Sequence, residues 1–279
     1  MVSAFHPATL AEALEIRARE GAVPFAGGTD LMVRLRRGAG ALPSFERSVL
    51  FLDRCPELRG IRRLPGGLEV GAMVTLAELA DCPDVPASLR EAVLQMGGPA
   101  LRCVATIGGN ICNASPAADT LPFLYAFEAR LRLGAAGSER ELAVDSFITG
   151  PGRMVLQPHE ILHSVILPAW SPSACLWRKV GTRKANALTK VSIAAFAEQR
   201  GARIRRARIA LGAVGPVVVR LKEVEALLEA GKAGGPDDAA RIAEAVRAAV
   251  HPIDDQRSTA EYRREVAAGL VTTFVEGIT

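Results

Sequence analysis

The sequence predicts an α+β protein, and three observations support this fold class. Through about residue 133, apolar residues at helical spacing alternate with short apolar runs bounded by Gly and Pro, which is typical of intermixed helices and strands. Residues 191–199 and 204–214 have the pattern of an antiparallel strand pair that turns at Gly201. After residue 221 the spacing of the apolar residues is helical again.

The change in sequence texture near residue 175 divides the chain into two expected domains. We expect an α/β domain over residues 1–174, with subdomains of about 1–55 and 56–174. A smaller C-terminal domain, residues 175–279, should combine an antiparallel sheet with helices. The length of 279 residues is sufficient for two domains of these sizes.

The helix predicted over residues 10–20 has clear signals at both ends. Thr9 and Glu12 form the pattern of a capping box, and Gly21 ends the run. Further strands are predicted at 23–26, 48–52, 61–63, 68–70, 129–133, 160–167 and 174–180, and further helices at 29–37, 76–80, 87–96, 121–127, 221–230, 237–249 and 259–274. Ser258 and Glu261 predict a second capping box, at the start of the last helix.

The composition excludes several classes of protein. Hydrophobic residues make up 49% of the chain and charged residues 23%, which excludes disordered, collagen-like and coiled-coil chains. The net charge is +4, but the basic residues are scattered singly or in short pairs, so we expect no nucleic-acid partner. No apolar run approaches the roughly 20 residues that a helix needs to cross a membrane, so we expect no membrane-spanning segment.

The five cysteines are odd in number and include no CxxC pair. Iron–sulfur clusters and structural zinc need closely spaced thiolates, so we expect this chain to hold neither. The odd number of cysteines also predicts a reducing compartment, the cytoplasm. The first residues do not show the charged segment followed by an apolar segment that is typical of a secretory signal, which predicts the same compartment.

The segment PFAGGTDL combines a short strand, two glycines and a helix start. Such a turn exposes several backbone N–H groups in one concavity without a Cβ atom that keeps a ligand away, which suits a phosphate or diphosphate. The pattern also occurs in purely structural turns, and it lacks the GxGxxG spacing of the dinucleotide fingerprint. The candidate residues are Pro24, Phe25, Ala26, Gly27, Gly28, Thr29, Asp30 and Leu31.

A turn-rich segment, residues 97–122, is expected to be a long loop, and loops of this length are usually functional. Within it, ATIGGN places a hydroxyl, two glycines and an amide together and predicts a second cluster of hydrogen-bond donors. The candidate residues are Thr106, Ile107, Gly108, Gly109 and Asn110. Asp119 follows and is either an acceptor for a ligand's ribose or ring N–H, or a helix cap ahead of Leu121.

Residues 159–163 spell HExxH, which on a helix places two imidazoles on one face for zinc and uses the glutamate as general base. Here the segment is β-branched and apolar and is flanked by Pro158 and Pro168, so it predicts a strand. On a strand, residues i and i+4 lie about 13 Å apart, too far to share one ion. A metallopeptidase is therefore a remote alternative, and we expect neither a metal site nor a catalytic residue in this chain.

Three segments, in this order and at these separations, resemble the FAD-binding medium subunits of the molybdenum hydroxylases, the xanthine dehydrogenase and carbon monoxide dehydrogenase family. They are AGGTDL, LRCVATIGGNICNASPAADTLP and FITGPGRMVLQPHEILHSVILP. The resemblance covers essentially the whole chain. It implies a two-subdomain FAD-binding fold of the PCMH/VAO type, noncovalently bound FAD, and a C-terminal domain of the molybdenum hydroxylase flavoprotein type.

The resemblance also assigns residues to the cofactor. It implies that residues 24–31 hold the diphosphate and ribityl chain of FAD and that residues 106–110 close from the other side. Four further residues match positions near or against the cofactor, with Leu162 beside the flavin ring: Met96, Asp119, Leu162 and Lys179. We expect backbone N–H groups, and not arginines, to bind the diphosphate. Cys103 departs from the family, whose members usually carry a polar residue there.

The function that the resemblance implies is electron transfer within a complex. A molybdopterin large subunit would oxidise the substrate, [2Fe-2S] clusters on a small subunit would carry the electrons, and FAD on this chain would pass them to NAD, a quinone or oxygen. Such complexes are heterotrimers or dimers of heterotrimers. The alternative is a stand-alone FAD-dependent oxidoreductase of the same superfamily, with its own substrate pocket and often a His or Cys for covalent flavin attachment.

Overall fold

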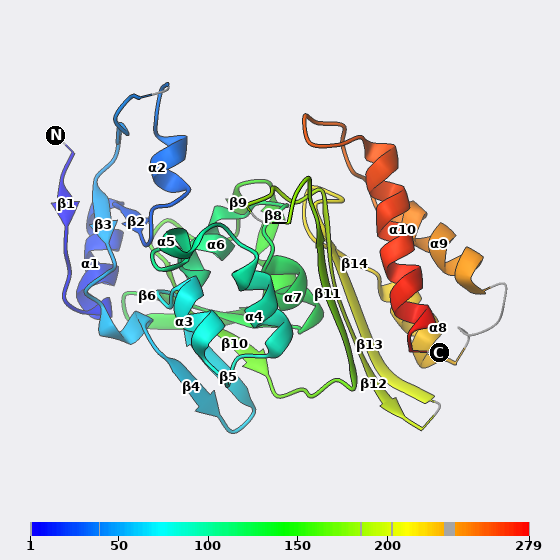
Figure 1. Ribbon diagram of the computed structural model, residues 1–279. Helices are drawn as coiled ribbons and strands as arrows, with labels where there is room; N and C mark the ends of the chain where they lie inside the picture. The colour runs from blue at the N-terminus through cyan, green and yellow to red at the C-terminus, as the bar shows by residue number, and fades with distance from the viewer. Residues whose placement is uncertain (1, 39, 185, 202, 232–237, 279) are drawn as a thin grey trace.

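The computed structural model describes residues 2–38, 40–184, 186–201, 203–231 and 238–278. Along the chain it forms an amino-terminal part, a middle part and a C-terminal part, each built on its own sheet (Figure 1). Helices and antiparallel sheets are both present, so the predicted α+β class is confirmed. No helix in the described ranges is long and apolar enough to cross a bilayer.

The amino-terminal part is a small parallel sheet with one helix. The strands β1 (Ala4–Phe5), β3 (Val49–Phe51) and β2 (Val23–Phe25) lie in the order β1-β3-β2. Helix α1 (Leu10–Glu20) precedes β2, and helix α2 (Leu31–Arg34) follows it. Leu10, Ala13 and Leu14 on α1 are buried in the core of this part.

The start of α1 follows the predicted signal with one difference. The Thr9 side chain accepts a hydrogen bond from the Glu12 backbone N–H at 3.2 Å, as expected of an N-cap. The Glu12 carboxylate, however, accepts from the N–H of Ala8 and not from that of Thr9. Gly21 ends the helix in the left-handed conformation with φ of 58°.

The middle part is a five-stranded antiparallel sheet in the order β4-β5-β10-β6-β7. Its strands are β4 (Ile61–Leu64), β5 (Gly67–Gly71), β10 (Ile161–Pro168), β6 (Arg130–Ala135) and β7 (Ser138–Ala143). Its helices are α3 (Leu76–Asp81), α4 (Ala87–Leu94), α5 (Pro99–Arg102), α6 (Ile107–Asn113) and α7 (Leu121–Ala126), and a separate hairpin joins β8 (Ile148–Gly150) to β9 (Arg153–Met154).

The C-terminal part is a four-stranded antiparallel sheet covered by three helices. Its strands, in sheet order, are β11 (Ala174–Val180), β12 (Val191–Arg200), β13 (Arg203–Gly212) and β14 (Val219–Arg220). Helices α8 (Lys222–Glu229), α9 (Asp238–Ala249) and α10 (Ala260–Glu276) lie on its outer face (Figure 1). Residues alternate along β12: Ile193 and Ala195 pack toward the helices, whereas Ala194 and Phe196 belong to the core of the middle part.

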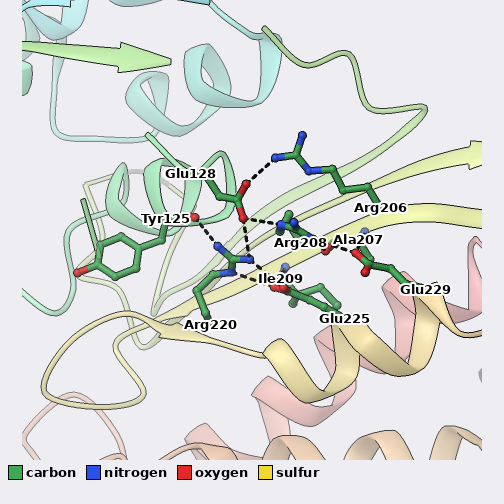
Figure 2. A network of polar contacts seen from close by, with 9 residues as sticks. All are labelled: Tyr125, Glu128, Arg206, Ala207, Arg208, Ile209, Arg220, Glu225 and Glu229. Carbon is green, nitrogen blue, oxygen red and sulfur yellow. Dashed lines mark hydrogen bonds and ion pairs between the residues drawn. The ribbon is translucent and has the colours of Figure 1, made fainter. Parts of the chain in front are cut away.

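A polar network fastens the C-terminal part to the middle part (Figure 2). Arg220 donates to the Tyr125 carbonyl at the end of α7 at 2.8 Å and forms an ion pair with Glu225 on α8, also at 2.8 Å. Glu128, just after α7, pairs with Arg208 on β13 at 2.7 Å. The two parts therefore share charged contacts as well as an apolar interface.

Several predicted elements differ from the structure. Segment 97–122 is not one loop, because it contains α5 and α6. The last helix is capped by Thr259, which accepts from the Tyr262 N–H, so the capping box predicted at Ser258 is wrong by one residue. Helix α2 ends three residues before the predicted residue 37. Residue 237, predicted to begin a helix, lies outside the described residues, and α9 is described from Asp238.

Candidate functional site

A cleft of about 470 Å³ lies where the amino-terminal and middle parts meet. The loop from β2 to α2 forms one wall and the start of α6 forms another. The predicted residues in its lining are Pro24, Ala26, Gly27, Gly28, Thr29, Asp30, Leu31, Met96, Thr106, Gly108, Gly109, Asn110 and Leu162. Both glycine motifs, far apart in the sequence, therefore face one cavity.

Glycine is needed in the first loop for close backbone packing. A Cβ atom on Gly27 would lie 2.0 Å from the Val104 carbonyl oxygen, so the β2–α2 loop touches the chain that leads into α6. Gly28 has φ of +68°, and a Cβ atom there would lie 2.3 Å from the Phe25 ring. The ring of Phe25 packs against Phe51 at 4.8 Å between centroids, and Phe25 does not line the cleft.

The backbone N–H groups of the β2–α2 loop are available to a ligand. Among the described residues, no group accepts a hydrogen bond from the backbone N–H groups of Gly27, Gly28, Thr29 or Asp30. These donors belong to residues of the cleft lining, where successive free N–H groups form an anion-binding concavity. Gly27, Gly28 and Thr29 are half-buried and Asp30 is exposed. A diphosphate that enters the cleft can accept hydrogen bonds from these N–H groups.

The second glycine motif behaves differently from the prediction. Thr106 caps α6 by accepting from the Gly109 N–H at 3.1 Å, and its carbonyl accepts from Asn110. The N–H groups of Ile107 and Gly108 donate to carbonyls of Val74 and Ala72. The expected second cluster of free backbone donors is therefore wrong, because this segment is a capped helix start and not a loop. Ile107 itself is buried in the core.

Asn110 still offers a donor to the cleft. Its Oδ1 accepts a hydrogen bond from the Thr120 hydroxyl at 2.5 Å. Because the amide oxygen is engaged, the NH₂ group of Asn110 is left for a ligand. On the opposite wall, the Asp30 carboxylate accepts from Asn113 at 3.0 Å and keeps further acceptor capacity, which suits a ribose hydroxyl.

The rest of the cleft is largely apolar and fits a flat ring system. Leu162 and Ile161 on β10, together with Met96, contribute apolar side chains to it. Cys112 also lines the cleft, and burial raises the pKa of its thiol to about 12. The thiol therefore stays protonated at neutral pH, which makes it a poor nucleophile for covalent flavin attachment.

Asp119 and Lys179 lie apart from this cleft and form a buried ion pair at 2.5 Å. The Asp119 carboxylate also accepts from the Thr189 hydroxyl at 2.5 Å. Burial raises the pKa of Asp119, whereas the Lys179 ammonium and the Thr189 hydroxyl act in the opposite direction. Lys179 lines a second hollow together with Gln95, whose neighbour Met96 lines the cleft.

Two arginines in the cleft lining were not predicted. Arg34 lies at the exposed end of α2, and Arg17 lies in the last turn of α1. A signal for Arg17 was present in the sequence, because it continues the apolar face formed by Leu10, Ala13 and Leu14. An arginine on that face is expected to be buried.

The last three residues of the HExxH segment lie in β10, which begins at Ile161, one residue after the predicted start, and His159 lies in the preceding turn. Arg140 binds the Glu160 carboxylate through two nitrogen atoms, at 2.6 and 2.9 Å, and so holds it in an ion pair. His163 Nδ1 lies 3.2 Å from a carboxylate oxygen of Glu139. The strand removes the helical geometry on which the metallopeptidase alternative depends. In the described parts of the chain, no group of three or more His, Cys, Asp or Glu side chains is placed to hold a metal ion.

Free backbone donors next to an apolar wall define a site for a cofactor that carries both a diphosphate and a flat ring system. The comparisons with known proteins agree with this class of site. A family model described as the FAD binding domain in molybdopterin dehydrogenase matches residues 1–170, and one described as the CO dehydrogenase flavoprotein C-terminal domain matches residues 178–278. The chain therefore belongs to the FAD-binding subunits of the molybdenum hydroxylase family.

Individual relatives support the same assignment. The xanthine dehydrogenase FAD-binding subunit of Escherichia coli O157:H7 is 29% identical over 226 residues, covering 78% of this chain and 76% of the relative. The carbon monoxide dehydrogenase medium chain of Hydrogenophaga pseudoflava is 29% identical over 223 residues, covering 79% and 77%. A chain in a solved structure of that bacterium's carbon monoxide dehydrogenase superposes with a TM-score of 0.88 at 27% identity, covering 98% of this chain and 96% of that chain.

Proposed function

We propose that this chain is the electron-transfer flavin subunit of a molybdenum-containing hydroxylase or dehydrogenase complex. It would receive electrons from [2Fe-2S] clusters on a small subunit and pass them to NAD, a quinone or oxygen. The observation that carries this proposal is the cleft, with its unpaired N–H groups at residues 27–30 and its apolar wall around Leu162. Bound FAD would supply all the redox chemistry, because the flavin accepts and releases electrons.

The residues of the chain would bind and orient the cofactor. We assign the diphosphate to the backbone N–H groups of Gly27–Asp30 and assign further hydrogen bonding to the Asn110 amide and the Asp30 carboxylate. Met96 and Leu162 would pack against the flat ring. Asp119 and Lys179, which pair with each other outside the cleft, would approach the cofactor through Lys179, which donates to the Gln95 carbonyl next to the cleft residue Met96. The protonated Cys112 supports noncovalent binding.

We also propose the partners and the compartment. The name "medium chain" of the carbon monoxide dehydrogenase relative supports assembly with an iron–sulfur small subunit and a molybdopterin large subunit, as a heterotrimer or a dimer of heterotrimers. All five cysteines are free thiols, which supports a reducing compartment, the cytoplasm.

The test is purification of the tagged full chain from its native cells, followed by measurement of flavin, iron and molybdenum in the purified material. We expect two further polypeptides to co-purify, with iron and molybdenum bound to them and FAD bound to this chain. A chain that purifies alone and oxidises a substrate by itself would instead indicate a stand-alone flavin oxidoreductase. If the chain carries no FAD, whether it purifies alone or within a complex, the proposal is contradicted.

A further inference from the structure

Arg17 is a buried cation at the edge of the candidate cofactor cleft. Its relative exposure is 9%, and it belongs to the lining of the cleft. The only hydrogen bond that its side chain makes to a described residue runs from Nη1 to the Ala22 carbonyl at 2.5 Å, and its buried Nε has no partner among the described residues. No described carboxylate pairs with it.

The surroundings of Arg17 disfavour its charge in the absence of a ligand. Burial lowers the pKa of Arg17, and the charge of Arg47 lowers it further. Arg47 is close because its guanidinium donates to the carbonyl of Gly21, at the end of the same helix. A buried charge without a counter-ion is destabilising, so buried charged groups are usually paired.

Its neighbour Arg19 shows the usual arrangement of an arginine on this helix. The Arg19 side chain is 65% exposed and forms an ion pair with Glu20 at 2.8 Å. Arg34, the other arginine of the cleft lining, is exposed and can be solvated by water. Arg17 therefore differs from both, because it is neither solvated nor paired with an acid of the described chain.

We propose that Arg17 is a cofactor-binding residue whose guanidinium pairs with the diphosphate of FAD. This inference rests on the proposed function. The diphosphate is the part of FAD that is ionised at neutral pH, so it is the part that can neutralise a buried cation. Charged hydrogen bonds from guanidinium groups to phosphate oxygens are strong, and the Nε of Arg17 is free to donate one.

The test compares FAD binding by the full-length chain and its Arg17→Met, Arg17→Lys and Arg19→Met variants, measured by calorimetric titration. Arg17→Met keeps an apolar stem and removes the charge, Arg17→Lys keeps the charge, and Arg19→Met makes the same substitution at the exposed arginine of the same helix. We expect Arg17→Met to weaken FAD binding by about 10- to 100-fold, Arg17→Lys to weaken it less, and Arg19→Met to leave it unchanged.

A second readout separates binding from folding. Thermal unfolding without FAD should be cooperative for all four proteins, and the rise in Tm caused by a fixed FAD concentration should be smallest for Arg17→Met. If the wild-type chain binds FAD and Arg17→Met binds it equally well, the role of Arg17 is overturned while the proposed function stands. If Arg17→Lys binds FAD as weakly as Arg17→Met does, the role of the Arg17 charge is also overturned. If the isolated wild-type chain binds no FAD, the flavin content of the complexes purified from native cells is compared for the same variants, and a wild-type complex without FAD would overturn the proposed function itself.

Discussion

Gly108 and Gly109 are adjacent in the chain but have different surroundings. A Cβ atom on Gly108 would lie 2.6 Å from the Ala72 carbonyl oxygen, so this glycine is required for backbone packing. A Cβ atom on Gly109 would lie 3.0 Å from the Thr106 hydroxyl and 3.8 Å from Ala26, which lies across the cleft. A larger side chain at 109 would therefore extend into the cleft, whereas one at 108 would push against the backbone.

We predict that Gly109→Leu abolishes FAD binding while the chain stays folded. The leucine would occupy cofactor space, and its better helix propensity, about 0.8 kcal/mol, offsets part of the strain against Thr106. Flavin retention after gel filtration and the urea midpoint of unfolding measure the two effects. Gly108→Leu is the matched control and should lower the unfolding midpoint sharply. Stoichiometric flavin in Gly109→Leu would show that this helix start does not contact the cofactor.

Glu160 gives a pH-dependent contribution to stability. Its carboxylate is 6% exposed, and hydrogen bonds from Arg140 hold its pKa below the ordinary value of 4.5. Because the folded-state pKa is depressed, the stabilisation is present above about pH 4.5 and is lost as the pH falls through the folded-state pKa. We predict that the difference in unfolding free energy between wild type and Glu160→Gln is larger at pH 7 than at pH 3.5. Urea titrations at both pH values measure it, and a difference that stays constant would refute the assignment.

Strand β14 and helix α8 depend on the ion pair of Arg220 with Glu225. The two side chains are 9% and 6% exposed, and the Glu225 carboxylate also accepts from the Ile209 N–H of β13 at 2.7 Å. Removing the acid leaves the Ile209 N–H without its partner. It also leaves the buried Arg220 with only the Tyr125 carbonyl and a longer contact of 3.6 Å with Glu128. We predict that Glu225→Ala lowers the free energy of unfolding by about 3 kcal/mol. Glu223→Ala, on the exposed face of the same helix, should change it by less than about 0.5 kcal/mol in the same urea titration.

The longer elements could be predicted from the sequence because their signals are local. Helix α1 has a cap and a left-handed glycine, and β12 and β13 are long alternating strands. The two-residue strands β1 and β9 could not be predicted, because they exist through pairing with distant or neighbouring strands. Segment 97–122 was misjudged because glycine and asparagine predict turns, whereas Thr106 capping and contacts with the segment at 72–74 stabilise α6.

The sequence predicted residues that the structure brings together at the cleft, whereas their contact with FAD stays a prediction. Both glycine motifs line the cleft, as expected from close backbone approach. The pairing of the α6 N–H groups with Ala72 and Val74 depends on tertiary contacts that no local pattern contains. The position of Asp119 and Lys179 outside the cleft lining is also tertiary, because the two side chains come from distant segments and pair with each other at 2.5 Å.

The chain as a whole forms the candidate cleft between two parts and attaches a third to the middle one. The amino-terminal part contributes the β2–α2 loop and Arg17, and the middle part contributes α6 and β10. The C-terminal part contributes Lys179 from β11, which reaches the acid Asp119 of the middle part. The charged network around Glu128 fixes the C-terminal part to the middle part (Figure 2).

The central claim is that this chain binds FAD in the cleft of the β2–α2 loop. Its most direct test is a calorimetric titration of the full-length chain with FAD, combined with the visible spectrum of the protein after gel filtration. We predict saturation at one FAD per chain, a retained flavin spectrum and a higher Tm in the presence of FAD. Absence of bound flavin, both in this titration and in the complex purified from native cells, would contradict the account.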